Sequence, residues 1–175
     1  MDGSIQDERY RQAAAEFGAA LERLARAYEF DADRRRDLLQ EIHLALWRSF
    51  AVFDGRCSSR TWVYRVAHNT AVSYSIGRRR SGDRNLVGLE EVELTLGDRD
   101  GDEAAGRRHA LGRLTEMIQS LKPLDRQVIL SYLEGMDAAS IGEITGLAPG
   151  NVATRIHRIK TVLARRFSEG ANHAK

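Results

Sequence analysis

The feature that most constrains the fold is a pair of amphipathic segments near the C-terminus, separated by a short break over residues 146–150. Ile141 and Ile144 give the first segment one apolar edge. The break contains two glycines and a proline, which interrupt helices. The second segment then resumes with apolar residues at helical spacing, namely Val152, Ile156, Ile159, Leu163 and Phe167. This pattern predicts two helices joined by a tight turn.

The opposite face of the second predicted helix is basic. No acidic residue occurs between Pro149 and Phe167. The polar side chains of that face are Asn151, Thr154, Arg155, Arg158, Lys160, Arg165 and Arg166. A basic face attracts phosphates, and helix-turn-helix proteins place their second helix in the DNA major groove. We therefore predict a DNA-reading helix, with a purely structural helix pair as the alternative.

Apolar residues at helical spacing predict further helices over about residues 9–30, 33–50, 59–80, 107–121 and 123–134. Between them, residues 81–106 carry eight acids against two arginines, whereas residues 60–80 carry five arginines and no acid. The apolar residues between Leu86 and Leu96 nearly alternate, which favours either a short strand or an extended segment docked on a partner. The sequence thus predicts an all-α fold with two small helical domains, 1–80 and 107–175, joined by an acidic linker over 81–106.

Several functional classes lack support in the sequence. A membrane-spanning helix needs about 18 consecutive apolar residues, and the chain has no such run and no secretion signal, so we expect a cytoplasmic protein. Cys57 is the single cysteine and the five histidines are scattered, which disfavours disulfides, metal sites and cofactor-dependent catalysis. The acids at Asp98, Asp100 and Asp102 do not follow the spacing of a calcium loop. We expect no enzyme activity, no metal and no cofactor.

Three strings resemble the sigma-70 superfamily of bacterial RNA polymerase initiation factors. They are Asp37-Leu38-Leu39-Gln40-Glu41 running into Leu46-Trp47, Phe53-Asp54-Gly55-Arg56 followed by Thr61-Trp62-Val63-Tyr64-Arg65-Val66-Ala67-His68-Asn69-Thr70-Ala71, and Leu121-Lys122-Pro123-Leu124-Asp125-Arg126-Gln127-Val128. Their order and spacing match the small extracytoplasmic-function (ECF) type, which has only the sigma-2 and sigma-4 domains. The resemblance spans about residues 17–80 and 111–167.

This resemblance implies that the chain binds core RNA polymerase and promoter DNA. The first string would dock on the clamp helices of the polymerase β′ subunit, and the C-terminal domain on the β flap. The expected docking residues are Asp37, Leu38, Gln40, Glu41 and Leu44. On the sequence alone, a solvated helix face is an equally good reading of this string.

The second string resembles the part of sigma factors that opens the promoter and holds a base of the minus-10 element. Opening a duplex needs phosphate neutralisation and a place for an unstacked base. The expected contacts are Asp54, Arg56, Ser58, Ser59, Arg60, Arg65, His68 and Asn69. Trp62 shares a helical row with Val66 and is expected in the core, whereas Tyr64 lies off that row and is open to either role.

The basic helix resembles the reader of the minus-35 element. Arginine can bond bidentately to guanine, so the helix's N-terminal turns are the best candidates for base contacts. The expected contacts are Asn151, Thr154, Arg155, Arg158 and Lys160, the last of them to phosphate. The chain departs from the usual pattern at Ala148, at Ala153 and over residues 138–140. Ala148 replaces a helix-capping serine, which weakens the cap by about 1 kcal/mol.

These observations predict an ECF-type sigma factor that directs promoter-specific initiation. The family resemblance also implies an anti-sigma protein as a partner. The main alternative is a free-standing helix-turn-helix regulator that binds duplex DNA without polymerase. A nuclease that uses the linker acids is disfavoured, because those acids lack histidine or cysteine partners.

Overall fold

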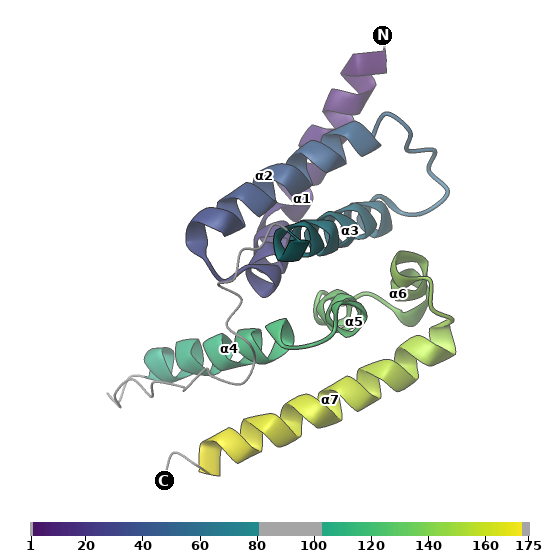
Figure 1. The fold of residues 1–175 in the computed structure, drawn as a ribbon. Helices are drawn as coiled ribbons and strands as arrows, with labels where there is room; N and C mark the ends of the chain where they lie inside the picture. Colours follow the sequence, from purple (N-terminus) through teal and green to yellow (C-terminus); the bar gives the residue numbers. More distant parts are fainter. Residues whose placement is uncertain (1, 81–102, 173–175) are drawn as a thin grey trace.

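The computed structural model describes residues 2–80 and 103–172, and each of its elements is an α-helix, as Figure 1 shows. The helices are α1 Asp2–Tyr28, α2 Ala32–Ser49, α3 Ser59–Arg80, α4 Glu103–Gln119, α5 Pro123–Leu133, α6 Ala138–Thr145 and α7 Pro149–Asn172. The predicted all-α class is confirmed. The expectations for Leu86 to Leu96, and for the acids at 98–102, fall outside the described residues.

Helices α1, α2 and α3 pack against one another and form the N-terminal unit. Their apolar rows meet in a core that includes Leu21 of α1, Leu38 and Ile42 of α2, and Val63 of α3, each completely buried. A side-chain cap sets where α2 begins. The carboxylate of Asp31 accepts the N–H of Arg34 at 2.9 Å, which satisfies a donor that has no partner within the first turn of α2.

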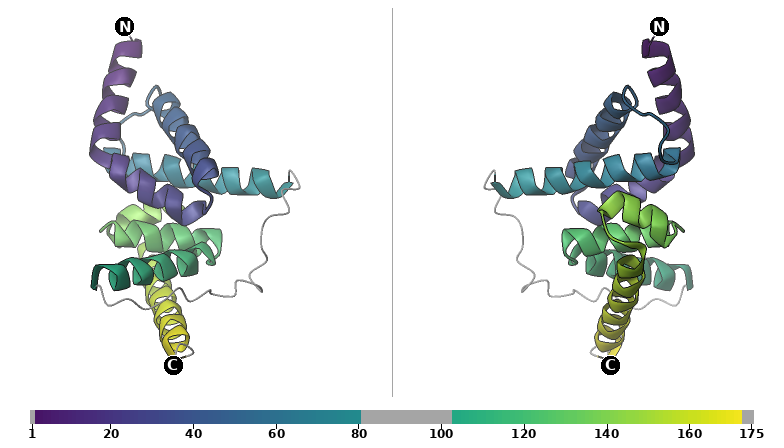
Figure 2. Two further views of the ribbon diagram at one scale, coloured as in Figure 1. Left: turned by 90° about the vertical axis from the view of Figure 1, so that its left-hand side faces the viewer. Right: turned by 90° about the vertical axis from the view of Figure 1, so that its right-hand side faces the viewer.

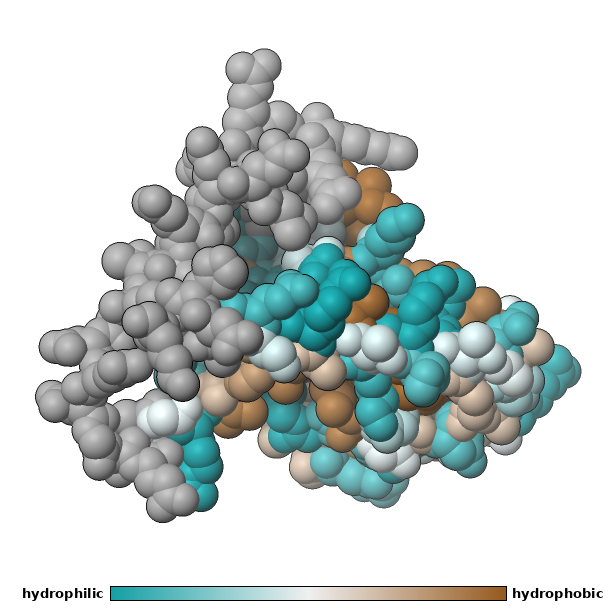
Figure 3. Space-filling view, turned by 90° about the horizontal axis from the view of Figure 1, so that it is seen from below, coloured by the Kyte–Doolittle hydropathy of each residue, from teal (hydrophilic) through white to brown (hydrophobic). Residues whose placement is uncertain are grey.

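The C-terminal unit consists of α4 to α7, and α7 lies against α4, α5 and α6. Its core includes Val128 of α5, Ile141 of α6 and Val152 of α7, all completely buried. Figure 3 views the molecule from the side of α4 and α7. Hydrophobic side chains emerge there between hydrophilic ones, and the exposed residues of these two helices include Leu111 and Phe167.

The two units pack together in what we call the closed arrangement. Helices α5 and α6 lie beneath α1 and α3 in Figure 1, and the two views of Figure 2 agree with this placement. Helix α3 contacts α5 and α6, and α1 contacts α4. The buried apolar side chains of both units form one continuous cluster. In the part of the chain that the structure describes, no helix is both long and apolar enough to cross a lipid bilayer.

Candidate nucleic-acid interface

The turn between α6 and α7 fixes the angle of the predicted reading helix. Gly146 adopts a φ of 77°, a left-handed conformation that favours glycine, and its N–H bonds to the carbonyl oxygen of Gly142 at 2.8 Å. Gly142 is needed for a different reason, because a Cβ atom there would lie 2.6 Å from the carbonyl oxygen of Leu147. The carboxylate of Asp137 accepts the N–H of Ser140 at 2.7 Å and caps α6, which lowers the pKa of Asp137.

Helix α7 turns one face to the protein and the other to solvent. Val152, Ile159 and Leu163 are buried, as their spacing predicted. Four of the five predicted minus-35 contacts are exposed: Asn151, Thr154, Arg158 and Lys160. The exposed side chains therefore form a polar and basic surface along one side of the helix.

Arg155, the fifth predicted minus-35 contact, is partly buried. Its Nη1 atom donates to Oδ1 of Asp125 on α5 at 2.5 Å. Nη2 of Arg158 lies 3.6 Å from the same oxygen. The sequence did not single out Asp125 as a site residue, because hydrophobic spacing gives no information about which acid faces a helix from another element.

The loop before α3 and the first residue of α3 carry four of the predicted minus-10 residues, and all four are exposed: Asp54, Arg56, Ser58 and Ser59. Gly55 adopts a left-handed conformation there, with a φ of 76°. Asp54 accepts the N–H of Arg56 at 3.1 Å and pairs with its guanidinium at 3.0 Å. The hydroxyl of Ser58 accepts the N–H of Thr61 at 3.0 Å and caps α3. Hydrogen bonds thus order this loop while its polar side chains stay accessible.

The other predicted minus-10 residues lie on α3, and three of them contact the C-terminal unit. Arg60 donates to the carbonyl oxygen of Glu134, and Nε of Arg65 donates to that of Glu143 at 3.1 Å. His68 is completely buried. In the closed arrangement its ring cannot contact DNA, so the predicted minus-10 contact of His68 stays a prediction for an arrangement in which the two units separate. Asn69, by contrast, is exposed.

His68 joins the two units through both ring nitrogens. Nδ1 lies 3.1 Å from the hydroxyl of Tyr28 on α1, and Nε2 lies 3.3 Å from the hydroxyl of Ser131 on α5. Burial lowers the pKa of His68 to about 3, because a charged ring would be desolvated there. The imidazole is therefore neutral, and it can both donate and accept a hydrogen bond.

Beside Arg60, an ion pair also links the N-terminal and C-terminal units. Nε and Nη2 of Arg23 on α1 donate to the two carboxylate oxygens of Glu134 at 2.7 and 2.8 Å. This bidentate bond lowers the pKa of Glu134. Arg23, Arg60, Tyr64 and Glu134 together line a pocket between the two units. Tyr64, whose role was open, is buried, and Trp62 is partly buried and donates to Ser49 at 3.0 Å.

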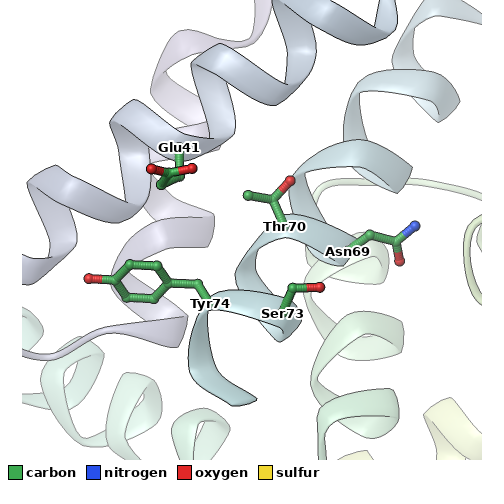
Figure 4. A pocket seen from close by; sticks show the side chains of 5 residues that line it. All are labelled: Glu41, Asn69, Thr70, Ser73 and Tyr74. Carbon is green, nitrogen blue, oxygen red and sulfur yellow. The ribbon is translucent and has the colours of Figure 1, made fainter. Parts of the chain in front are cut away.

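The predicted docking face of α2 is exposed at Asp37, Gln40 and Glu41, and Leu44 is 40% exposed. Leu38 is completely buried, so it belongs to the core and has no surface to offer a partner; its row faces α1 and α3. Figure 4 shows Glu41 on α2 across an open pocket from Thr70 and Tyr74 on α3, with Asn69 at the edge. The docking face and the predicted minus-10 surface are therefore adjacent.

Within the described residues, no group of three or more histidine, cysteine, aspartate or glutamate side chains is placed to hold a metal ion. The described residues instead present two separate polar surfaces, one on α7 and one on the loop and α3. Both are built from side chains that suit phosphates and base edges. Their chemistry is that of nucleic-acid recognition.

Comparison with known proteins agrees with this chemistry. Residues 14–81 match the family model for sigma-70 region 2, and residues 111–163 match the model for sigma-70 region 4. The chain is 32% identical over 146 residues to the ECF RNA polymerase sigma factor SigL of Mycobacterium tuberculosis, which covers 81% of this chain and 79% of SigL. It is 30% identical over 134 residues to the ECF RNA polymerase sigma-E factor of Haemophilus influenzae, covering 73% and 71% of the two chains.

The fold has a solved counterpart. The sigma factor RpoE of Bartonella quintana, crystallised with the anti-sigma factor NepR, superposes with a TM-score of 0.67 at 21% identity. The match covers 91% of this chain and 96% of that one. Two region models in the expected order, relatives along most of the chain and a shared fold lead to one conclusion: the chain belongs to the ECF sigma factors of the sigma-70 family.

Proposed function

We propose that this sigma factor binds core RNA polymerase and directs initiation by reading two promoter elements with two separate surfaces. A sigma-2-like domain over residues 1–80 would bind polymerase and the minus-10 element. A sigma-4-like domain over residues 107–175 would read the minus-35 element and contact the β flap. The observation that carries the proposal is the exposed polar face of α7, which is held in place by the buried row at Val152, Ile159 and Leu163.

The exposed polar residues in the first turns of α7 support the proposed minus-35 contact. The helix begins at Pro149, directly after the turn, and Asn151 and Thr154 lie exposed in its first turns. In a helix-turn-helix these turns reach base edges, while residues farther along contact phosphates. Asn151, Thr154, Arg155 and Arg158 would therefore read bases, and Lys160 would bind phosphate.

The polymerase contact is supported by the exposed face of α2. Asp37, Gln40 and Glu41 are exposed on the same face of α2 as the accessible side chain of Leu44. Apolar contact within a polar rim is characteristic of a surface that binds another protein. We assign this face to the β′ clamp helices. The polymerase would supply all of the chemistry, and the complex would form in the cytoplasm.

The minus-10 contact requires the closed arrangement to open. Arg60 and Arg65 donate to carbonyl oxygens of the C-terminal unit, and His68 is covered by it. These side chains cannot bind a DNA strand at the same time. We propose that polymerase binding separates the units, after which Arg60, Arg65 and His68 join Asn69 and the exposed residues of the 54–59 loop on the minus-10 strand.

An anti-sigma protein is a further proposed partner. The structural counterpart from Bartonella quintana was solved with its anti-sigma factor NepR. A protein that binds the separated units, or stabilises their contact, would keep this chain from polymerase. Co-purification of this chain with a small partner encoded near it would support that assignment.

Reconstituted transcription tests the proposal. Core polymerase with this chain should initiate from a subset of a promoter library, and core polymerase alone should not. If the purified chain shifts duplex DNA by itself yet adds no initiation, a free-standing regulator explains the fold better.

Matched variants on α3 test the proposed minus-10 surface. Asn69→Ala should change the preferred minus-10 sequence, because an exposed amide that can bond a base edge is lost. Ser73→Ala, an exposed position one turn farther along α3, is the control and should leave the preference unchanged. Identical preferences for Asn69→Ala and the parent chain would remove Asn69 from the site.

A further inference from the structure

Asp125 lies in the first turn of α5, and its carboxylate reaches α7 across the helix-turn-helix. Its Oδ1 atom lies 2.5 Å from Nη1 of Arg155 and 3.6 Å from Nη2 of Arg158. The side chain of Asp125 is 15% exposed and that of Arg155 is 27% exposed, whereas Arg158 is 63% exposed. The inner pair is thus largely withdrawn from water, and Arg158 extends beyond it.

This acid carries a cost for DNA binding. It brings a negative charge to a helix whose own residues between Pro149 and Phe167 include no acid. A negative charge beside the reading face weakens the attraction of phosphates. The packing of α5 on α7 does not depend on the ion pair alone, because Val128, Val152 and Ile159 are buried in the same unit. We therefore expect a function of Asp125 other than holding α5 and α7 together.

The geometry of arginine provides such a role. A guanidinium carries five N–H donors in a rigid plane. The bond from Nη1 of Arg155 to Asp125 fixes that plane and leaves other donors for a second acceptor. Guanine presents N7 and O6 side by side in the major groove, where arginine bonds to both. A side chain that is already fixed loses less conformational entropy when it binds.

We propose that Asp125 is a positioning residue that holds Arg155 for reading a guanine of the minus-35 element. Asp125 lowers the overall attraction to DNA and raises the selectivity for the correct base. The inference rests on the proposed minus-35 role of α7. It assigns to Arg155 the base contact that is most sensitive to sequence, and to Arg158 a more adaptable contact.

The test is a competition assay with the complete chain bound to core polymerase. Its readout is the ratio of affinities for a promoter fragment and for a fragment of equal length with a scrambled minus-35 element. Asp125→Asn keeps the size of the side chain and removes its charge. We expect this ratio to fall about tenfold, while the affinity for the scrambled fragment stays equal or rises.

Two further variants separate positioning from simple charge. Glu169→Gln removes one negative charge from an exposed pair with Arg165 on the same helix, where the atoms are 3.7 Å apart and both side chains are over 60% exposed. It should leave the affinity ratio unchanged. Arg155→Lys keeps the charge and loses the planar fork, so it should lower the ratio as Asp125→Asn does. Combining Asp125→Asn with Arg155→Lys should lower the ratio no further than either change alone.

Three outcomes would overturn the inference. Asp125→Asn could leave the ratio unchanged, or it could raise the affinity for both fragments equally, which would make Asp125 only a competing charge. Full additivity with Arg155→Lys would also contradict it. If Asp125→Asn does not fold, as a thermal melt would show, Asp125→Glu takes its place: it keeps the charge and displaces the carboxylate, so it should lower the ratio if Asp125 positions Arg155, and an unchanged ratio would overturn the inference. If the unsubstituted chain with polymerase does not distinguish the two fragments, the proposed function fails instead, so the two failures are distinguishable.

Discussion

The closed arrangement should open more readily as pH falls below about 6.5, because His68 is buried between the two units. Burial lowers the pKa of its ring to about 3 from an ordinary value of 6.5. Separation of the units would remove Ser131 from Nε2 and expose that nitrogen to water. The open form then binds a proton that the closed form cannot bind, so protonation favours opening.

The size of the effect follows from these pKa values. At pH 7.5 the exposed ring is largely neutral, and the opening equilibrium is almost unaffected. At pH 5.5 protonation multiplies the open population by roughly tenfold, which corresponds to about 1.4 kcal/mol. Glu134 does not contribute to the pH dependence of opening between pH 7.5 and pH 5.5, because its pKa is lowered from 4.5 and its carboxylate stays ionised over this range. His43, whose pKa is also lowered, lies against Tyr10 inside the N-terminal unit.

Energy transfer between two dyes measures this equilibrium. The positions Gln40→Cys and Ala164→Cys are exposed and lie in different units, and Cys57→Ser removes the native thiol. Transfer should fall between pH 7.5 and pH 5.5 as the units separate. His68→Gln carries no titratable ring and should abolish that fall. Equal pH dependence in both chains would refute the assignment of His68 as the titrating group at the interface.

Three further predictions concern the interface, the turn and a glycine inside α4. Removal of the Arg23 or Glu134 side chain should raise the open population by roughly two- to fivefold, which corresponds to about 0.5–1 kcal/mol. The effect is small because Arg23 is 58% exposed and solvent screens the ion pair. A double-mutant cycle measured by the same energy transfer should show coupling between the two residues, and additive effects would contradict the pair. Gly142→Ala should destabilise the C-terminal unit by about 1–3 kcal/mol, because its methyl group meets the Leu147 carbonyl. Gly112→Ala, which meets no atom within 4 Å, should raise stability by up to about 1 kcal/mol, as calorimetry can check.

Hydrophobic spacing predicted each helix of the described residues, because each buries one apolar stripe. The predicted limits of α3, 59–80, match the observed helix Ser59–Arg80. Helix α1 begins at Asp2, well before the predicted start at about residue 9. Its first turns are held by polar contacts instead. Gln6 donates to the carbonyl oxygen of Trp47 at 2.7 Å, and Asp7 accepts from the indole of Trp47 at 2.8 Å. Such contacts leave no periodic signal in a sequence.

The sequence likewise predicted one part of the candidate site and not another. The exposed face of α7 could be predicted, since the residues between its apolar positions must face outward when those positions are buried. The burial of His68 could not, because its covering residues come from the other unit. Ser131 lies 63 positions away in the chain. The spacing of residues within α3 gives no information about a contact between units.

The contacts made by Arg60 and Arg65 show why the closed arrangement leaves no trace in the sequence. Both side chains donate to backbone carbonyls, of Glu134 at the end of α5 and of Glu143 near the end of α6. Carbonyl groups at helix C-termini carry partial negative charge and lack partners within the helix. An arginine that suits a phosphate oxygen therefore also suits a helix end. The same basic residues that predict DNA binding can hold the chain closed, and the competition between the two acceptors needs no dedicated acidic partner.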